Sequence, residues 1–353
     1  MPHGDHAPSS VRSTRLHRAS NRLTAVLDDY DKALVTGGLG FIGRHLVRAL
    51  LDCEKDVTVL DSGATAHDRA LPAGVNLARA DIRNPEQVKQ AFSSADLVFH
   101  LAGNSSGTLS VLDPRFDFET NALGTFNVLE GVVAARARRL VYVSSASVYG
   151  VPRRFPMDED HPTRPFMPYG ASKLAGELAA LAQFHALELP VVVGRPFCVY
   201  GPGEDLDIAL VEVSRYLRWH LNDRPVAVVG DGDRKTRDFV HVSDVVAALL
   251  LLADRAPAGE VYNIGSGDET SMCELVSIIA DVTGRPASIA EISDVTQDTY
   301  RLVADISKLR ALGFEPRVSL VDGARALAAE LSSTPELPGT ATIFRAGQQA
   351  ERA

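Results

Sequence analysis

The sequence predicts an α/β fold in which a parallel sheet is covered by helices on both faces and a smaller α/β lobe closes over one edge. Two observations indicate this architecture. In the first half of the chain, short apolar runs alternate with longer stretches whose apolar residues recur at helical spacing, which is the pattern of βαβ units. Beyond Arg195 this regular alternation ends, as expected for a lobe at the carboxyl ends of the strands, where such sheets bind ligands.

These patterns predict the individual elements. In the first half, strands are expected at 33–36, 57–60, 75–80, 97–101, 140–143 and 191–193. Helices are expected at 43–51, 84–92, 118–135 and 168–186, the second of them with a proline in its first turn. In the second half, helices are expected at 208–221, 243–252, 272–282 and 320–331, and strands at 226–229 and 261–264.

The turn after the first strand predicts where a dinucleotide is held. Residues 33–43 read Ala-Leu-Val-Thr-Gly-Gly-Leu-Gly-Phe-Ile-Gly, so a strand ends in a glycine turn that leads into a helix. Gly37, Gly40 and Gly43 would make the tight turn, let backbone N–H groups approach the phosphates, and let the helix pack on the strand. The helix N-terminus adds positive potential for a pyrophosphate. This order of strand, turn and helix indicates a Rossmann-type, doubly wound sheet.

Asp61 predicts which dinucleotide binds. It ends the second expected strand, about 20 residues beyond the glycine turn, where a carboxylate can hydrogen-bond both ribose hydroxyls of an adenosine. The same charge would repel a 2′-phosphate, so NAD is favoured over NADP. The alternative is that Asp61 only opens the turn Asp61-Ser62-Gly63.

The composition excludes several classes of protein. The 353 residues are 45% hydrophobic and 23% charged, as in an ordinary globular protein. A net charge of −9 argues against a nucleic-acid-binding protein, and no apolar run approaches the roughly 20 residues that span a membrane. Cys53, Cys198 and Cys273 are scattered without metal-ligand spacing, so we expect no metal and a reducing compartment, the cytoplasm.

Composition shifts predict the domain boundaries. Residues 1–30 carry arginines among serine, histidine and proline with little apolar content, so we expect a disordered extension, and a flexible tail at 332–353. Residues 31–195 would form the NAD-binding domain, with a return segment near 239–262. Residues 196–238 and 263–331 would form the substrate-binding lobe.

Tyr169 and Lys173 are the candidate proton-transfer pair. They lie four residues apart in Pro168-Tyr-Gly-Ala-Ser-Lys, so a helix places the phenol and the ammonium on one face. A nearby cation favours the phenolate and lowers the pKa of the phenol toward the working pH of a general base. Ser145, in the serine-rich stretch after the strand at 140–143, would hold the substrate oxygen.

Taken together, these motifs resemble the extended short-chain dehydrogenase/reductase family, the NAD-dependent sugar epimerases and dehydratases. The resemblance covers residues 32–331. Its motifs, in chain order, lie at 36–43, 81–82, 100–103, 121–125, 144–150, 169–173 and 236–242.

The resemblance implies a role for each matching residue. The cofactor would be lined by Phe41 and Ile42 at the pyrophosphate, Asp61 at the adenosine ribose, Asp81 and Ile82 at the adenine, and Leu101, Ala102, Asn121, Tyr169, Lys173 and Phe197 beyond them. Ser145 matches the catalytic Ser/Thr, Tyr169 the base, and Lys173 the residue that touches the nicotinamide ribose. Arg237 and Arg301 match arginines that grip a substrate diphosphate. The alternative for either arginine is a surface ion pair.

Two positions narrow the function. The related dehydratases carry acidic residues directly after the catalytic Ser/Thr, where this chain has Ala146 and Ser147. Without a carboxylic acid there, elimination of water is unsupported, and epimerisation is favoured. Cys198 stands among the substrate-binding positions, where relatives usually have an asparagine. The Cys198 side chain could be a reactive thiol, or it could simply fill a buried position as a small hydrophobic group.

The expected function is therefore that of an NAD-dependent epimerase of a nucleotide-diphosphate sugar. Inversion is expected at C4, through a transient ketone and with NAD retained. The resemblance also implies a homodimer formed by the helices at 118–135 and 168–186. Three alternatives remain: a keto-sugar reductase or dehydratase of the same family, an epimerase of a sugar phosphate or nucleoside, and a non-catalytic NAD-binding regulator.

Overall fold

The computed structural model describes residues 27–64, 70–92, 95–206, 211–292, 300–333 and 335–337. Within these residues, the larger part of the fold is a seven-stranded sheet in the order β11-β6-β5-β4-β1-β2-β3. Its strands are β1 (Lys32–Thr36), β2 (Asp56–Asp61), β3 (Asn76–Arg79), β4 (Leu97–His100), β5 (Arg139–Val143), β6 (Val191–Pro196) and β11 (Val261–Ile264). All its pairings are parallel, which confirms the predicted fold class.

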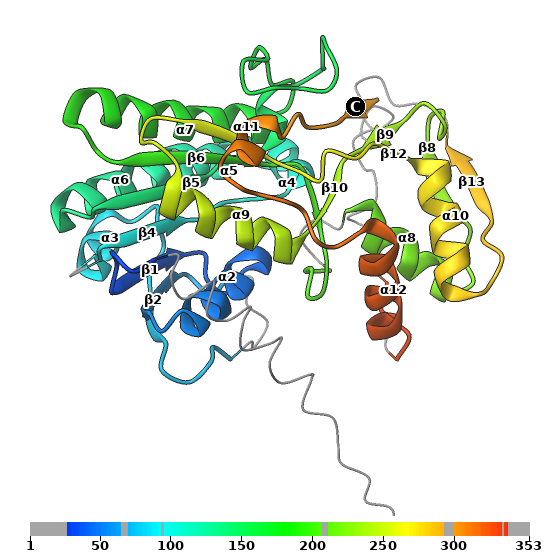
Figure 1. The fold of residues 1–353 in the computed structure, drawn as a ribbon, viewed down its shortest axis with the longest axis horizontal. Helices are drawn as coiled ribbons and strands as arrows, with labels where there is room; N and C mark the ends of the chain where they lie inside the picture. The colour runs from blue at the N-terminus through cyan, green and yellow to red at the C-terminus, as the bar shows by residue number, and fades with distance from the viewer. Residues whose placement is uncertain are drawn as a thin grey trace, which may run out of the picture.

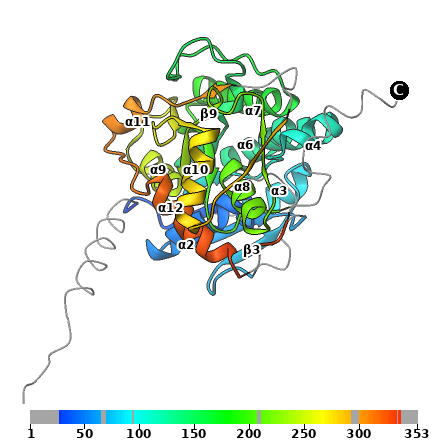
Figure 2. The same ribbon diagram turned by 90° about the vertical axis from the view of Figure 1, so that its right-hand side faces the viewer.

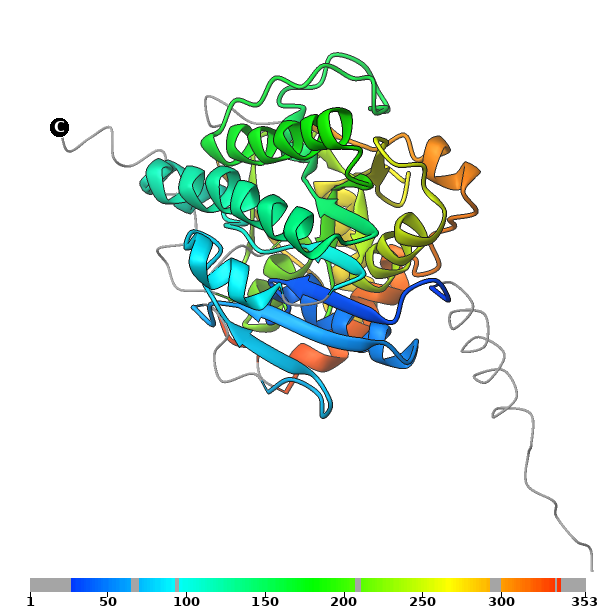
Figure 3. The same cartoon turned by 90° about the vertical axis from the view of Figure 1, so that its left-hand side faces the viewer.

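Helices cover both faces of this sheet (Figure 3). α2 (Phe41–Asp52) and α9 (Val242–Arg255) lie on one face, and α3 (Pro85–Ala91), α6 (Gly124–Ala135) and α7 (Pro168–Leu187) lie on the other. Successive strand residues point to opposite faces. In β1, Val35 therefore packs in the core under α2 and α9, whereas Leu34 packs in the core under α6. Burial on both faces explains why these strands read as nearly continuous apolar runs.

The helix predicted at 118–135 is interrupted. The structure has α5 (Pro114–Phe118), a π-helical turn over Glu119–Leu123, and then α6. The amide of Asn121, in the middle of this turn, donates to Asn104 O (3.1 Å) and to Ser172 Oγ (3.0 Å). The sequence pattern missed the interruption because these partners are distant in sequence. Single π-helical turns of this kind are frequent at functional sites.

A smaller lobe lies beside the carboxyl ends of the strands (Figures 1 and 2). Its apolar core is formed by α8 (Glu212–Leu221), α10 (Met272–Thr283) and α12 (Leu320–Leu331) with β8 (Val226–Val229), which pairs with β13 (Ile289–Ile292). The helix predicted at 208–221 thus starts at Glu212, and residues 207–210 are outside the described part.

Short elements complete the described chain, and the sequence pattern missed them. They are α4 (Gly107–Leu112), β7 (Cys198–Tyr200), β9 (Thr236–Arg237), β10 (Phe239–His241), β12 (Thr270–Ser271), β14 (Arg301–Leu302) and α11 (Ser307–Ala311). Elements of two to six residues show too few repeats to reveal a period.

The observed packing differs from the expected boundaries at three places. Leu27, expected in the disordered extension, is buried in the main core. Ile306 and Phe314, expected in the smaller lobe, also pack in the main core, because α11 lies against β11. Glu336, expected in the tail, accepts a hydrogen bond from Arg218 through its carbonyl (2.8 Å). Residues 1–26 and 338–353 lie outside the described part.

Among the helices in the described part of the chain, none combines the length and the apolar character that a membrane-spanning helix needs.

Candidate active site

The residues singled out from the sequence gather at one edge of the sheet because its strands are parallel. Gly37 follows β1, Asp61 ends β2, Leu101 follows β4, Ser144 follows β5 and Phe197 follows β6. All five are therefore at the carboxyl ends of their strands, on the side where the smaller lobe lies (Figure 1). This edge is where open parallel sheets bind their ligands.

The glycine turn has the form that a dinucleotide pyrophosphate requires. Gly37 adopts a φ of +72°, and a Cβ atom on it would lie only 2.7 Å from Ala102 N, so a side chain has no room there. A Cβ on Gly43 would collide with Gly37 O. Within the described residues, no side chain caps the start of α2 at Gly40 and Phe41. The first N–H groups of this helix are thus available to an anion.

The Asp61 carboxylate connects the turn after β2 to the glycine turn. Its Oδ1 accepts a hydrogen bond from Gly63 N (2.8 Å), which closes the turn after β2. Its Oδ2 accepts one from Leu39 N (3.0 Å), in the middle of the glycine turn. The carboxylate is therefore fixed beside the expected pyrophosphate site, as contact with an adenosine ribose would require. That contact stays a prediction.

The remaining cofactor candidates lie around the same edge. The guanidinium of Arg83 holds the carboxylate of Asp81 at 2.5 Å and lowers its pKa. Thr36 fixes the chain after β4, because its hydroxyl accepts from Ala102 N (3.1 Å) and its carbonyl from Leu101 N (3.1 Å). Other members of the set are buried or half-buried: Phe41, Ile42, Ile82, Asn121 and Phe197. Their cofactor contacts stay predictions.

Ser145, Tyr169 and Lys173 come together between β5 and α7. Tyr169 and Ser145 share a side-chain hydrogen bond. Lys173 is 5% exposed, donates from Nζ to Val143 O (2.7 Å), and lies 4.8 Å from the centre of the Tyr142 ring. Burial lowers the pKa of Lys173 to about 8. The structure thus places Tyr169 and Lys173 one turn apart on α7, with Ser145 beside Tyr169 and the end of β5 beside Lys173, and their catalytic roles stay a prediction.

The expectation that the pKa of Tyr169 is lowered is wrong. Burial raises the pKa of this phenol, and the hydrogen bond with Ser145 opposes the increase only in part. The Lys173 ammonium is directed to the Val143 carbonyl instead. Desolvation therefore outweighs any attraction from the cation.

A buried ion pair behind this site was missed. Glu177 on α7 forms a two-pronged contact with Arg195 on β6, and the two side chains are 1% and 6% exposed. Glu177 Oε2 also accepts from Ser144 Oγ (2.6 Å), the residue directly before Ser145. The spacing could have revealed Glu177, because it lies four residues after Lys173 on the same helix face.

The expected substrate residues lie in the smaller lobe or at its border. Arg237 is 8% exposed, and its Nε lies 3.7 Å from Glu212 Oε1. Cys198 is half-buried on β7, and burial raises the pKa of its thiol, which favours the small-hydrophobe alternative over a reactive thiol. Arg301 forms two hydrogen bonds of 2.7 Å with the Glu269 carboxylate. A phosphate would have to compete with that pair, so the substrate role of Arg301 stays a prediction.

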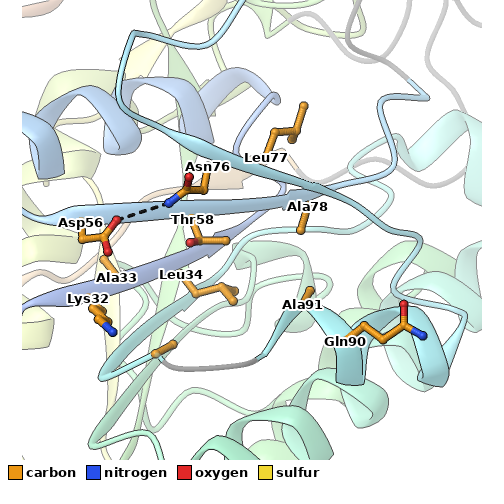
Figure 4. A pocket seen from close by; sticks show the side chains of 11 residues that line it. Lys32, Ala33, Leu34, Asp56, Thr58, Asn76, Leu77, Ala78, Gln90 and Ala91 are labelled. Atoms are coloured by element: carbon orange, nitrogen blue, oxygen red, sulfur yellow. Dashed lines mark hydrogen bonds between the residues drawn. The ribbon is translucent and has the colours of Figure 1, made fainter.

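A cavity of about 330 Å³ lies elsewhere on the sheet (Figure 4). Lys32, Asp56 and Asn76, the first residues of β1, β2 and β3, contribute to its lining, and Asn76 donates to Asp56 Oδ1 (3.4 Å). These residues mark the amino ends of the strands. The cavity is therefore at the opposite edge from the glycine turn and from Tyr169.

Comparisons with known proteins agree with this geometry. The model of the NAD dependent epimerase/dehydratase family matches residues 33–265. The UDP-glucose 4-epimerase of Mycolicibacterium smegmatis is 35% identical over 300 residues, covering 83% of this chain and 96% of that protein. A dTDP-glucose 4,6-dehydratase of an Actinoplanes species is 33% identical over 307 residues, covering 83% and 95%.

A solved structure is also similar to this chain. The crystal structure of Thermus thermophilus UDP-glucose 4-epimerase in complex with NAD matches with a TM-score of 0.80 at 33% identity, covering 86% of this chain and 99% of that one. The sheet, the glycine turn and the family match lead to one conclusion: the chain belongs to the NAD dependent epimerase/dehydratase family, within the extended short-chain dehydrogenases/reductases.

Proposed function

We propose that this protein is an NAD-dependent epimerase that inverts C4 of a UDP-hexose. The observation that carries the proposal is the hydrogen-bonded pair of Tyr169 and Ser145 at the sheet edge that also bears the glycine turn. A hydroxyl at this edge would lie between a proton acceptor and the dinucleotide. The names of the similar epimerases from Mycolicibacterium smegmatis and Thermus thermophilus support UDP-glucose as the first substrate to test.

The proposed mechanism divides the proton chemistry among three side chains. When bound, NAD would act as a reversible two-electron oxidant. Ser145 hydrogen-bonds the oxygen on the reacting carbon, and Tyr169 removes the proton from that hydroxyl as the carbon is oxidised. Tyr169 returns the proton when the resulting ketone is reduced on its other face. Lys173 holds a positive charge nearby, which stabilises the phenolate.

Ala146 and Ser147 favour epimerisation over loss of water. Ala146 is 2% exposed and apolar, and Ser147 is exposed and carries no ionisable acid. Elimination of a hydroxyl needs a proton donor with a pKa near neutrality. Neither of these residues supplies one, so the keto-sugar formed here is expected to be reduced again rather than dehydrated.

The test is interconversion of UDP-glucose and UDP-galactose by the purified protein, followed by NMR. Tyr169→Phe should lower kcat by at least about 100-fold, since general-base catalysis contributes about 10²–10⁴-fold. Ser145→Ala should also lower kcat, whereas Ser147→Ala, its exposed neighbour, should not. Near wild-type turnover by Tyr169→Phe would refute the mechanism. A product lighter by one water, or net oxidation of added NADH, would identify the dehydratase or reductase alternative instead.

We further infer that the enzyme is a homodimer of the cytoplasm. Large apolar side chains on the outer surface of α5 to α7 are 40–58% exposed, which suits an interface. They are Phe118, Leu123, Phe126, Val133, Leu178 and Leu187. Scattered cysteines without the spacing of a disulfide framework favour a reducing compartment. Sedimentation equilibrium with Phe126→Glu, expected to yield monomers, tests the interface.

A further inference from the structure

A buried carboxylate lies next to the proton-transfer site and has no part in the mechanism above. Asp117, on α5, is 0% exposed. Its Oδ1 accepts from Asn104 Nδ2 (2.6 Å) and from Asn121 Nδ2 (3.1 Å). Its Oδ2 is buried without a hydrogen-bond partner among the described residues. A buried charge of this kind is costly unless it interacts with an opposite charge or with bound water.

Hydrogen bonds connect this carboxylate to the helix of the catalytic pair. Asn121 Nδ2, which donates to Asp117, also lies within 3.0 Å of Ser172 Oγ. Ser172 Oγ donates in turn to Tyr169 O (3.0 Å), in the first turn of α7. A change at Asp117 is therefore transmitted through one amide and one hydroxyl to the backbone of Tyr169.

Lys173 lies close to the same amides. The position that a Cβ atom on Gly103 would take is 2.5 Å from Asn121 Oδ1 and 4.0 Å from Lys173 Nζ. The amide and the ammonium thus both approach Gly103 from the side that a Cβ atom would occupy. Asn104, the next residue, is held by Asp117 itself. The turn after β4 therefore lies between Lys173 and the amide that Asp117 holds.

The other titratable groups around Lys173 carry no competing charge. His100 at the end of β4 bonds Thr36 and Thr125, and burial with the nearby Lys173 lowers its pKa to about 3, so it is neutral. Burial raises the pKa of Tyr142 on β5, so this phenol is neutral too. The carboxylates that act on Lys173 are Glu177 and Asp117.

These two carboxylates differ in their partners. Glu177 is engaged by the Arg195 guanidinium on both of its oxygens. Asp117 contacts only neutral amides among the described residues, and one of its oxygens remains unbonded. Its negative charge is therefore not cancelled by a contacting cation and acts on both Tyr169 and Lys173.

We propose that Asp117 is a positioning residue for proton transfer, which anchors the amides of Asn104 and Asn121 beside Gly103 and stabilises the Lys173 ammonium through its charge. The inference rests on the proposed roles of Tyr169 and Lys173. The proposal also gives a function to residues 104–108 after β4, which read Asn-Ser-Ser-Gly-Thr: Asn104 supplies one of the amides that hold Asp117.

The test is the pH dependence of kcat in Asp117→Asn, a variant that keeps the shape of the side chain and removes its charge. The charge of Asp117 raises the pKa of both Tyr169 and Lys173. Both limbs of the profile should therefore move to lower pH by on the order of half to one unit. The control is Asp113→Asn, which removes the exposed carboxylate that caps the same helix and should leave both limbs in place.

A purely structural role predicts a different outcome, in which kcat or the yield of folded protein falls while both limbs stay where they are. That result would overturn the proposal. If Asp117→Asn does not fold, Asp117→Ser, which offers the amides a hydroxyl acceptor, is tested in the same way, and unmoved limbs have the same meaning.

A second readout separates this proposal from the proposed function. The phenol of Tyr169 is titrated by ultraviolet absorbance, as the difference between each protein and its Tyr169→Phe derivative. A lower titration midpoint in Asp117→Asn supports the proposal even if UDP-glucose is not converted. An unchanged midpoint contradicts it even if the protein is an active epimerase.

Discussion

Removal of Glu177 should destabilise the protein strongly, because this residue neutralises a buried cation. In Glu177→Ala, Arg195 loses both acceptors of its Nε and Nη2 groups. Among the described residues it keeps Tyr149 Oη (2.9 Å) and Glu159 O (3.3 Å) as acceptors, both at Nη1. Breaking a buried ion pair from one side costs about 3–5 kcal/mol. Ser144 Oγ also loses its acceptor. Alanine favours the helix, so helix propensity adds no cost.

The assay is urea unfolding followed by circular dichroism, together with thermal melting. We expect the free energy of unfolding to fall by about 3–5 kcal/mol and Tm by about 6–10 °C, taking about 2 °C per kcal/mol for a chain of this size. The matched control is Asp158→Ala. It removes a carboxylate that pairs with Arg154 at 2.5 Å, but with both side chains more than 40% exposed, so the cost should be below about 1 kcal/mol.

One result would refute the reasoning. If Glu177→Ala lost less than about 1 kcal/mol, like the exposed control, then the buried pair would only offset its own desolvation and Arg195 would find water or another acceptor. A large loss in both variants would indicate that the carboxylates matter for some reason other than burial.

Two further predictions concern the glycine turn and the loop after β7. Gly37→Ala should abolish NAD retention and destabilise the protein by about 1–3 kcal/mol, because Gly37 has a positive φ and a Cβ atom there would lie 2.7 Å from Ala102 N. The control is Gly74→Ala, where φ is +88° but the space around a Cβ atom is open. Both variants are measured by thermal melting and by the NAD that they release on denaturation. Burial raises the pKa of Glu204 to about 8, so the folded protein binds a proton that the unfolded chain lacks between pH 4.5 and 8. The stability that this protonated side chain contributes is complete below pH 4.5 and is lost as the pH rises toward 8. Glu204→Gln lacks this titration, so urea unfolding at pH 5 and 8 should show its stability rising relative to the wild type by about 2–5 kcal/mol; an unchanged difference contradicts the assignment.

Much of the fold could be predicted from the sequence because local periodicity and tertiary burial agree there. The strands at 33–36 and 140–143 are apolar on both faces, and the structure buries both faces under helices. Glycine spacing located the turn after β1, although the close approach of Ala102 that leaves no room for a side chain at Gly37 comes from a distant part of the sequence. Strands β9 and β12 were not predicted because each has two residues, too few to show a period. Both are defined by pairing between distant segments: β9 pairs with β12 and with β14.

The sequence by itself therefore predicted the parallel sheet, the glycine turn and the placement of Tyr169 and Lys173 on one helix face, because these depend on local patterns and short spacings. Only the tertiary structure decided the charge environment of that set. Asp117, Glu177 and Arg195 come from α5, α7 and β6: Glu177 pairs with Arg195, and Asp117 is connected to the first turn of α7 through Asn121 and Ser172. Desolvation and Coulomb attraction act through space, so the raised pKa of Tyr169 and the role of Asp117 follow from packing and not from spacing.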